Sequence, residues 1–305
     1  MNATYRQTVS LLLEIAPVVF NTSCFAMKGG TAINLFVQDM PRLSVDIDVV
    51  FCDHSASRDE ALAKISSELH RIEYEIKMMG HETNIKKINT GEEVKIFVVG
   101  PDAQVKVEVN FIFRGTVLPV ELHSLTDKTQ QIFSTNIQIP ILSPAELYGS
   151  KLVAAMDRQH PRDLFDVMKM YESHGLTEEI LDCFVVYLAG HNRPVHEVLF
   201  SNPQPINEIF HNEFAGMTAE ILRIDDLVST RTRLMEELPA ALTKNHKDFL
   251  LSLVQAKPDW DSLPYTHLKY LPALQWKLKN LSRLKANYAD RFALQHAALK
   301  ARLPR

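Results

Sequence analysis

The sequence predicts an α+β protein, with a mixed sheet and helices over residues 1–142 and an all-helical region over residues 143–305. Three observations lead to this prediction. Alternating apolar and polar residues, typical of strands, occur in the first half. Apolar residues recur at helical spacing throughout the second half. Glycines are few, ten in 305 residues, and the chain has the length of about two domains.

The composition excludes several classes of protein. Hydrophobic residues make up 46 % and charged residues 23 % of the chain, which is ordinary for a folded protein and excludes a disordered one. No apolar run reaches the ~18 residues of a membrane span, and no signal peptide is visible. Cys24, Cys52 and Cys183 lack CxxC spacing, so neither a disulfide framework nor a zinc knuckle is expected. The cytoplasm is the expected compartment, without a membrane partner.

The first half begins with a helix over residues 4–20, because its apolar residues lie at helical spacing. Further elements are expected in the order strand, helix, strand, helix and three strands, over residues 24–27, 31–36, 45–51, 57–79, 81–88, 93–99 and 104–113. The last two strands are expected to form a hairpin across Gly100-Pro101-Asp102.

The second half begins with a helix start at Ser143, which is placed as an N-cap before Pro144 and the capping-box residue Glu146. This helix is expected to reach about residue 158, and His160 tops the turn before the next helix. Further helices are expected at about 177–189, 204–212, 216–237, 239–255 and 273–300.

The first candidate site is the segment Lys28-Gly29-Gly30-Thr31, where a strand turns directly into a helix. Two glycines let backbone N–H groups approach a ligand, and the helix N-terminus and the Thr31 hydroxyl complete a phosphate cradle. The alternative is a tight turn that needs glycine only for positive φ. Arg42 and Ser44 are candidate contacts to phosphate or base, or loop residues.

Asp46 and Asp48 add carboxylates to this candidate site. Residues i and i+2 of a strand point to the same face, so the two side chains converge. Adjacent carboxylates repel unless a cation lies between them, and hard oxygen ligands of this kind favour Mg²⁺. Glu108 lies on the polar face of a later strand and completes a three-carboxylate platform for two metals if that strand is adjacent. The alternatives are a solvated strand face and an exposed strand glutamate.

These residues resemble the nucleotidyltransferase superfamily, and more closely the AbiEii type of nucleotidyltransferase toxin. This type is the toxin half of type IV toxin–antitoxin and phage abortive-infection systems. Four segments within about residues 24–170 carry the resemblance: MKGGTAINLF, RLSVDIDVVF, VKVEVNF and SPAELYGSKLVAAMDRQHPRDLFDV. The last is the most specific, because ordinary polymerase-like transferases lack it. Thr31 stands where the superfamily more often has serine, which keeps the hydroxyl.

The resemblance implies a nucleotidyltransferase-like sheet and a metal-dependent transfer of NMP from an NTP to an acceptor hydroxyl, plausibly of RNA such as the tRNA 3′ end. It implies Mg²⁺ (or Mn²⁺) and a cognate, DNA-binding antitoxin. Within such an enzyme the predicted phosphate contacts are Lys28, Gly29, Gly30, Thr31 and Arg42, and the predicted metal ligands are Asp46, Asp48 and Glu108. Lys151 and Asp163 of the helical domain are implied to complete the active site, with Asp166 as the alternative aspartate.

The residues themselves leave other interpretations of Lys151 and Asp163 open. Lys151 suits a point-charge partner of a triphosphate, or a solvated helix lysine. Arg162-Asp163 at a helix start is equally compatible with a cap and a surface ion pair.

The C-terminal region is basic, with 12 Lys/Arg against 4 Asp/Glu over residues 241–305. Leu274, Leu278, Leu281, Leu284 and Tyr288 are expected to face the core. The opposite face is expected to present Lys277, Lys279, Arg283 and Lys285, with Trp276 nearby. A basic face with an aromatic residue suits an RNA backbone. The alternative is a solvated face that balances the acidic body.

Two other function classes remain open at this stage. One is a nucleotidyltransferase that modifies a protein or small-molecule hydroxyl, which needs no basic acceptor surface. The other is a non-catalytic nucleotide- or RNA-binding module. A metal-dependent nuclease leaves the phosphate cradle without a purpose.

Overall fold

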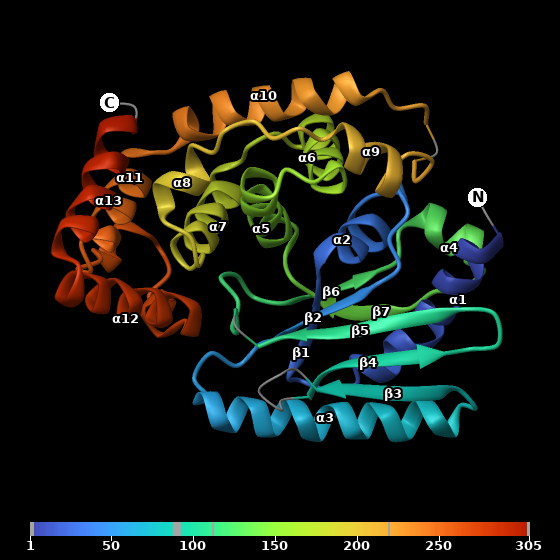
Figure 1. Cartoon of the computed structure of the whole chain (residues 1–305). Coiled ribbons are helices and arrows are strands. Elements are labelled where there is room, and N and C mark those ends of the chain that lie inside the picture. The colour runs from blue at the N-terminus through green and yellow to red at the C-terminus, as the bar shows by residue number, and fades with distance from the viewer. Residues whose placement is uncertain (1–2, 88–92, 112, 219, 304–305) are drawn as a thin grey trace. The chain divides into compact units, whose positions relative to one another are not determined.

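The computed structural model describes residues 3–87, 93–111, 113–218 and 220–303. The chain forms two compact units, which we call unit 1 and unit 2. Unit 1 comprises Met1–Pro144 together with Met217–Glu220, and unit 2 comprises Ala145–Gly216 and Ile221–Arg305. Unit 1 contains the sheet, and unit 2 is helical (Figure 1). The predicted fold class, a mixed sheet with helices followed by a helical region, is confirmed.

The sheet of unit 1 has seven strands in the described part of the chain, in the order β3-β4-β5-β2-β1-β7-β6. Strand β2 pairs with β5, and β1 with β7, in parallel, whereas the other neighbours are antiparallel. The strands are β1 (Phe25–Lys28), β2 (Ile47–Phe51), β3 (Glu82–Lys87), β4 (Glu93–Val99), β5 (Gln104–Asn110), β6 (Glu121–Ser124) and β7 (Gln138–Ile141).

Two helices cover one face of this sheet. Helix α1 (Ala3–Val19) contacts β5 and β7, and α3 (Arg58–Met78) contacts β3, β4 and α1. Figure 1 shows α3 running along the β3–β4 end of the sheet. Alternate residues of β5, the valines at 105, 107 and 109, are buried, so Lys106 and Glu108 lie on the opposite face. The remaining helices of unit 1 are α2 (Gly29–Ala32), which continues as the π-helix η1 (Ile33–Val37), and α4 (Asp127–Phe133).

Unit 2 is built around α7 (Glu178–Ala189), which is buried on all sides from Ile180 onward. Gly149 lets α5 approach α7 closely, because a Cβ at this position would lie 2.5 Å from the Cβ of Cys183. The other helices are α5 (Pro144–Asp157), α6 (Pro161–Ser173), α8 (Val195–Leu199), α9 (Asn207–Glu213), α10 (Ile224–Ala241), α11 (Lys244–Val254), η2 (Trp260–Ser262), η3 (Leu268–Tyr270), α12 (Pro272–Asn287) and α13 (Ala289–Arg302). Among the described helices, none is long and apolar enough to span a membrane.

The elements expected before residue 113 are confirmed, with small shifts of their ends. The Gly100 hairpin is present, closed by a hydrogen bond of 2.9 Å from Gly100 N to Ala103 O. Ile88, at the end of a predicted strand, and Ile112, within another, lie outside the described residues. Strand β5 ends at Asn110, short of the predicted Phe113. Sequence analysis made no assignment for the segment that forms β6, α4 and β7.

Three helix predictions in the second half need correction. The helix expected over 216–237 begins only at Ile224, because Met217 and Thr218 pair with the segment before β2, with Leu43 N 2.8 Å from Met217 O. The predicted break before residue 239 is wrong, since α10 continues to Ala241. The single helix expected over 273–300 is divided at Tyr288, whose backbone angles (φ −146°, ψ 63°) are not helical.

Candidate active site

The glycine turn at the end of β1 brings two charged side chains against the backbone. Lys28 is extended, Gly29 has a φ of 80°, and helix α2 begins there. A Cβ at Gly29 would overlap Asp48 Oδ2, and one at Gly30 would lie 2.5 Å from a terminal guanidinium nitrogen of Arg42. Gly29 is therefore required for its positive φ and for the close approach of Asp48, whereas a side chain at Gly30 would displace the end of the Arg42 side chain. Sequence analysis predicted the φ requirement as an alternative but not the packing of the two side chains.

The side chains around this turn are built into unit 1. Arg42 is buried, and its Nη1 donates to Leu43 O at 2.8 Å. Thr31, also buried, shares a hydrogen bond of 2.9 Å between its Oγ1 and Ser44 Oγ. The Ser44 N–H donates in turn to the Tyr5 hydroxyl oxygen at 3.3 Å. The loop before β2 is thus fixed against the helix that begins at the glycine turn.

Asp46, Asp48 and Glu108 form a group that we call the acid cluster. Asp48 and Glu108 lie on neighbouring strands, and Asp46 directly precedes the strand that contains Asp48. Strands β2 and β5 are parallel with Asp48 opposite Glu108, which confirms the expected adjacency. Asp46 lies directly before β2, whose predicted start at residue 45 is two residues too early, and its charge acts on Asp48. Burial raises the pKa of Asp48; Lys28 opposes this effect, and the charge of Asp46 adds to it.

Two lysines contact the acid cluster. Lys106 Nζ lies 3.1 Å from Glu108 Oε2 and 3.7 Å from Asp46 Oδ2. Lys95 Nζ lies 2.9 Å from Glu108 Oε1. Burial alone would raise the pKa of Glu108, but these ammonium groups outweigh it and lower that pKa. The Glu108 carboxylate is therefore ionised and partly neutralised by the two lysines.

The donor set at the acid cluster fits a divalent cation in part. Asp46 and Asp48 supply hard oxygen ligands, and Mg²⁺ in enzymes is held by one or two carboxylates plus substrate phosphates. Among the residues described, no group of three or more His, Cys, Asp or Glu side chains is arranged to hold a metal ion. With Glu108 paired to lysines, the expected three-carboxylate ligand set is not formed by these side chains as they stand.

Unit 2 contains a second charged group, which we call the lysine–aspartate cluster. Lys151 Nζ of α5 lies 2.8 Å from Asp163 Oδ1 and 3.0 Å from Asp166 Oδ2, both on α6. Arg158 Nε lies 2.5 Å from Asp163 Oδ2. Both aspartate side chains are 1 % exposed and that of Lys151 is 9 % exposed. Both aspartates that the resemblance leaves as candidates thus contact the same lysine.

The structure excludes two alternatives for these residues, a solvated lysine at 151 and a helix cap at 163. Lys151 is not solvated, and Asp163 is not a helix cap. The N-cap of α6 is His160, whose Nδ1 accepts from Arg162 N at 3.1 Å. Burial would raise the pKa of Asp163, but the ion pairs with Lys151 and Arg158 outweigh it and hold that pKa far below its usual range.

The predicted basic face of α12 requires a correction at Lys277. This side chain is only 6 % exposed, because its Nζ donates to His191 O at 2.8 Å and to Arg193 O at 2.6 Å. Burial lowers the pKa of Lys277 to about 8. Lys279, Arg283 and Lys285 are exposed as expected. Tyr288, expected in the core, is also exposed, because α12 ends there.

Three residues of these clusters were not found by sequence reasoning. Lys106 could have been found from the alternation along β5, since it shares a face with Glu108. Arg158 lies seven residues after Lys151, which is the same helix face. Lys95 had no local signal, because its contact with Glu108 depends on the β4–β5 register.

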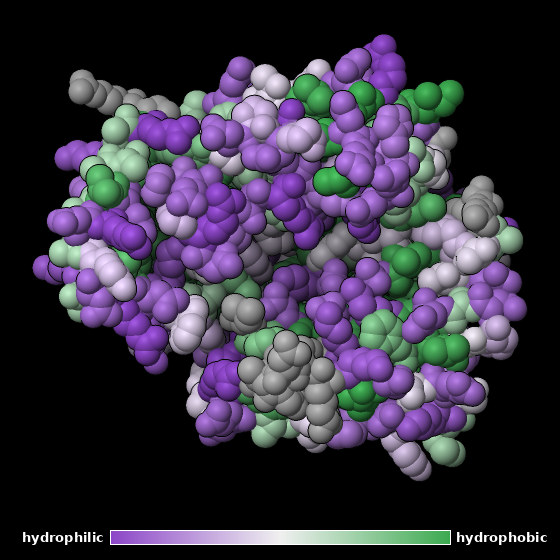
Figure 2. Space-filling view, in the orientation of Figure 1, coloured by the Kyte–Doolittle hydropathy of each residue, from purple (hydrophilic) through white to green (hydrophobic). Residues whose placement is uncertain are grey.

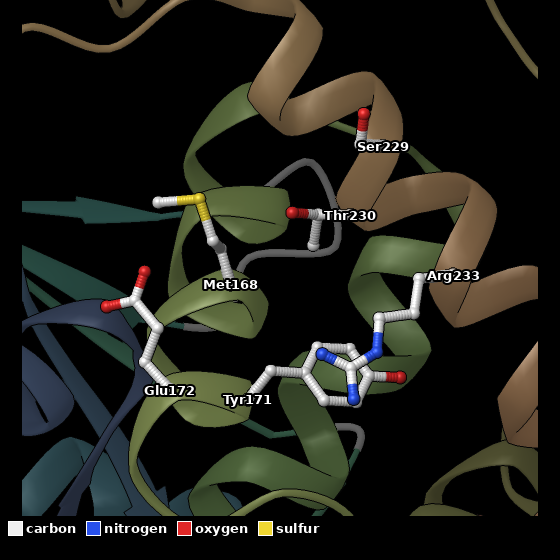
Figure 3. Close-up of a pocket in the computed structure, with 6 residues that line it drawn as sticks. All are labelled: Met168, Tyr171, Glu172, Ser229, Thr230 and Arg233. Carbon is white, nitrogen blue, oxygen red and sulfur yellow. The ribbon is translucent and has the colours of Figure 1, made fainter.

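A separate cavity of about 310 Å³ lies between α6 and α10, and none of the predicted site residues line it (Figure 3). Its lining residues are Met168, Tyr171, Glu172, Ser229, Thr230 and Arg233. The Arg233 guanidinium stacks 3.9 Å from the centroid of the Tyr171 ring.

Comparisons with known proteins define the class of this chain. The structure resembles MenT4, a nucleotidyltransferase toxin from Mycobacterium tuberculosis H37Rv, with a TM-score of 0.59. The match covers 92 % of this chain and 95 % of that chain at 15 % sequence identity. The chain therefore shares the fold of that toxin. A comparison with curated proteins gives no match.

The family model for the nucleotidyl transferase AbiEii toxin of type IV toxin–antitoxin systems matches residues 10–280. The chain therefore belongs to the AbiEii nucleotidyltransferase toxin family and is a nucleotidyltransferase. The resemblance seen in the sequence is confirmed. Membership of this family implies an NTP substrate and a cognate antitoxin.

Proposed function

We propose that the protein transfers NMP from an NTP to an acceptor hydroxyl in a reaction that depends on Mg²⁺ or Mn²⁺. The observation that carries the proposal is the packing of the Asp48 carboxylate against Gly29, with Asp46 two residues earlier beside Lys106. This arrangement joins a carboxylate pair to a strand–helix turn. A bound divalent cation neutralises the triphosphate and polarises the reacting phosphate.

In this proposal Asp46 and Asp48 hold the cation, and the glycine turn holds the phosphates. The phosphate contacts are Lys28, Gly29, Gly30, Thr31 and Arg42. The acceptor oxygen forms a bond to the α-phosphorus, the bond to the bridging oxygen breaks, and pyrophosphate leaves. The acceptor proton goes to a carboxylate.

Glu108 suits the role of proton acceptor better than Asp163. The Glu108 side chain is 33 % exposed and therefore accessible to an acceptor hydroxyl. Asp163 is almost completely buried, so an acceptor hydroxyl cannot reach it. Ion pairs lower the pKa of both carboxylates, so exposure rather than basicity decides between them. We therefore assign the proton to Glu108.

We assign the lysine–aspartate cluster to the same reaction, with Lys151 as the cation that stabilises the triphosphate as pyrophosphate leaves. The family resemblance supports this role. The burial supports it too, because ionised groups with strongly perturbed pKa values concentrate at functional sites. Asp163 and Asp166 then position the Lys151 ammonium group.

For the acceptor we propose RNA, such as the 3′ end of a tRNA, and α12 supplies a surface for it. Trp276, Lys279 and Arg283 are exposed and follow one face of this helix. Lys279 Nζ lies 5.8 Å from the Trp276 ring centroid. Figure 2 shows mostly hydrophilic side chains, with a few hydrophobic ones among them, over the region of α12 and α13. Cations and exposed aromatic rings favour an RNA backbone and stacked bases.

Lys285 is also exposed and stays a candidate RNA contact, but it lies on another side of α12, nine residues after Trp276. Lys277 is left out because it is buried. The wider proposal is a cytoplasmic toxin that blocks translation, acts in phage defence, and is neutralised by an antitoxin that binds DNA. The family supports a toxin with a cognate antitoxin.

The test of the reaction uses purified protein, Mg²⁺, total cellular RNA and each α-³²P-NTP in turn. We expect one RNA size class to be labelled with one NTP by the wild type and not by Asp46→Ala/Asp48→Ala. Cleavage of the RNA, or the absence of both label and pyrophosphate release with every acceptor, would overturn the proposal. Pyrophosphate release with protein or metabolite acceptors alone would show that the acceptor is not RNA.

The test of the RNA surface compares Lys279→Met/Arg283→Met with Lys244→Met/Lys247→Met, which removes two lysines from α11. We expect the first pair to raise the KM for RNA about tenfold, since two phosphate contacts are lost and the effect weakens at high salt. The KM for NTP should not change. If both double variants changed the KM for RNA equally, α12 would not be the specific RNA surface.

A further inference from the structure

Lys106 contacts the acid cluster, but the proposed reaction gives this lysine no role. It lies two residues before Glu108 on β5 and points to the same face. The parallel register that sets Asp48 opposite Glu108 also brings Asp46 toward Lys106. Its ammonium group lies within 4 Å of two carboxylates, those of Glu108 on β5 and of Asp46 directly before β2.

This position puts a positive charge beside Asp46, one of the two proposed metal ligands, and beside Glu108, the proposed proton acceptor. An ammonium group within 4 Å of two carboxylates supplies the positive charge that their proximity requires. It also repels a divalent cation that approaches the same oxygens. Lys106 and a metal ion therefore compete for the acid cluster.

The fold does not require Lys106 to be there. Its side chain is 30 % exposed, and ion pairs between partly exposed groups contribute little to stability. Lys95 already provides a partner for Glu108 from β4. The contact that distinguishes the two lysines is that of Lys106 with Asp46, a proposed metal ligand.

We propose that Lys106 is a tethered counter-ion that takes the place of the divalent cation until the nucleotide arrives. The metal ion then binds together with the NTP rather than before it, because the triphosphate supplies negative charge both to the metal and to Lys106. The Lys106 ammonium group moves from Asp46 and Glu108 to a phosphate oxygen. This inference rests on the proposed metal-dependent transfer and adds an order of binding to it.

The test measures Mn²⁺ binding by electron paramagnetic resonance, first with Mn²⁺ alone. We expect Lys106→Met to bind Mn²⁺ about tenfold more tightly than the wild type, because a unit charge some 6 Å away from a divalent ion in water has about this effect. Lys106→Arg, which keeps the charge, should match the wild type. Lys95→Met, the matched control, removes the same charge from Glu108 but not from Asp46 and should change the affinity by less than about threefold.

The second measurement adds α,β-methylene analogues of the four NTPs. The wild type should gain Mn²⁺ affinity with an analogue, and Lys106→Met should show a smaller gain because it lacks the phosphate partner. Equal effects of Lys106→Met and Lys95→Met, or no effect of either, would overturn the role of Lys106. The absence of Mn²⁺ binding to the wild type with every analogue, matched by Asp48→Asn, would instead overturn the metal dependence itself.

Discussion

The acid cluster of unit 1 and the lysine–aspartate cluster of unit 2 both combine carboxylates with lysine, but they differ in exposure. Glu108 and Lys106 are each about one-third exposed, at 33 % and 30 %. Asp163 and Asp166 are 1 % exposed. In the acid cluster the burial of Asp48 raises its pKa, whereas in the other cluster the ion pairs lower the pKa of Asp163.

This difference separates two ways of placing charge in an enzyme. Partly exposed ion pairs are weak, so a ligand can replace them at little cost. Buried ion pairs resist change, because removal of one partner leaves an unpaired charge away from water. The acid cluster is therefore suited to exchange lysine for metal and phosphate, and the lysine–aspartate cluster to hold one arrangement.

The largest effect is expected from Asp48→Asn. Loss of a metal ligand should lower the rate of pyrophosphate release about 10³-fold, or about 4 kcal/mol of transition-state stabilisation. The free energy of unfolding should stay the same or rise by about 1 kcal/mol, because burial already disfavours the Asp48 carboxylate. The measurements are a pyrophosphate assay and urea denaturation. Asp102→Asn, at an exposed hairpin position, is the matched control and should change neither.

The next largest effect is expected from Lys151→Met, which should lower the free energy of unfolding, whereas Asp48→Asn should not. Two buried aspartates lose their common partner, so the free energy of unfolding should fall by about 3–5 kcal/mol. The measurement is urea denaturation followed by circular dichroism. Lys244→Met removes an exposed lysine paired with Asp248 and should cost less than about 1 kcal/mol. A loss of less than about 1 kcal/mol for Lys151→Met would remove the contrast between the clusters.

The parts of the fold and site that sequence analysis predicted depend on local patterns. The alternation around Asp46 and Asp48 indicates β2, and the alternation around Glu108 indicates β5. The glycine turn follows from two glycines between a strand and a helix. Each signal lies within about ten residues, so the chain itself displays it.

The parts that sequence analysis missed depend on contacts between distant segments. The return of residues 217–220 to unit 1 is set by pairing with Arg42 and Leu43. The helical pattern predicts that Lys277 lies on the surface, but its ammonium group is buried and donates hydrogen bonds to the carbonyl oxygens of His191 and Arg193. No local pattern encodes such partners, because they lie more than 80 residues away in the chain.

Unit 2 has two buried lysines with different partners. Lys151 contacts carboxylates, whereas Lys277 donates its hydrogen bonds to backbone carbonyl oxygens. Burial lowers its pKa to about 8, from an ordinary value of 10.5. Between these pH values the unfolded chain binds more protons than the folded one, so the free energy of unfolding should rise with pH by about 1–3 kcal/mol. The measurement is the difference between wild type and Lys277→Met in urea denaturation at pH 7.5 and 10. A difference independent of pH would contradict a buried, charged Lys277.

The smallest effect is expected from Arg158→Met, within the lysine–aspartate cluster itself. Arg158 shares the Asp163 carboxylate with Lys151, but its own side chain is 62 % exposed. Water can replace much of what this guanidinium provides, so the free energy of unfolding should fall by less than about 1 kcal/mol.

The decisive measurement is the double-mutant cycle of Arg158→Met and Lys151→Met. In the Lys151→Met background Arg158 becomes the main counter-charge of Asp163, so its removal should cost more than in the wild type, by about 0.5–3 kcal/mol of coupling. Additive losses would show that each cation stabilises Asp163 independently. The cluster would then be two separate ion pairs, and its burial alone would distinguish it from the acid cluster.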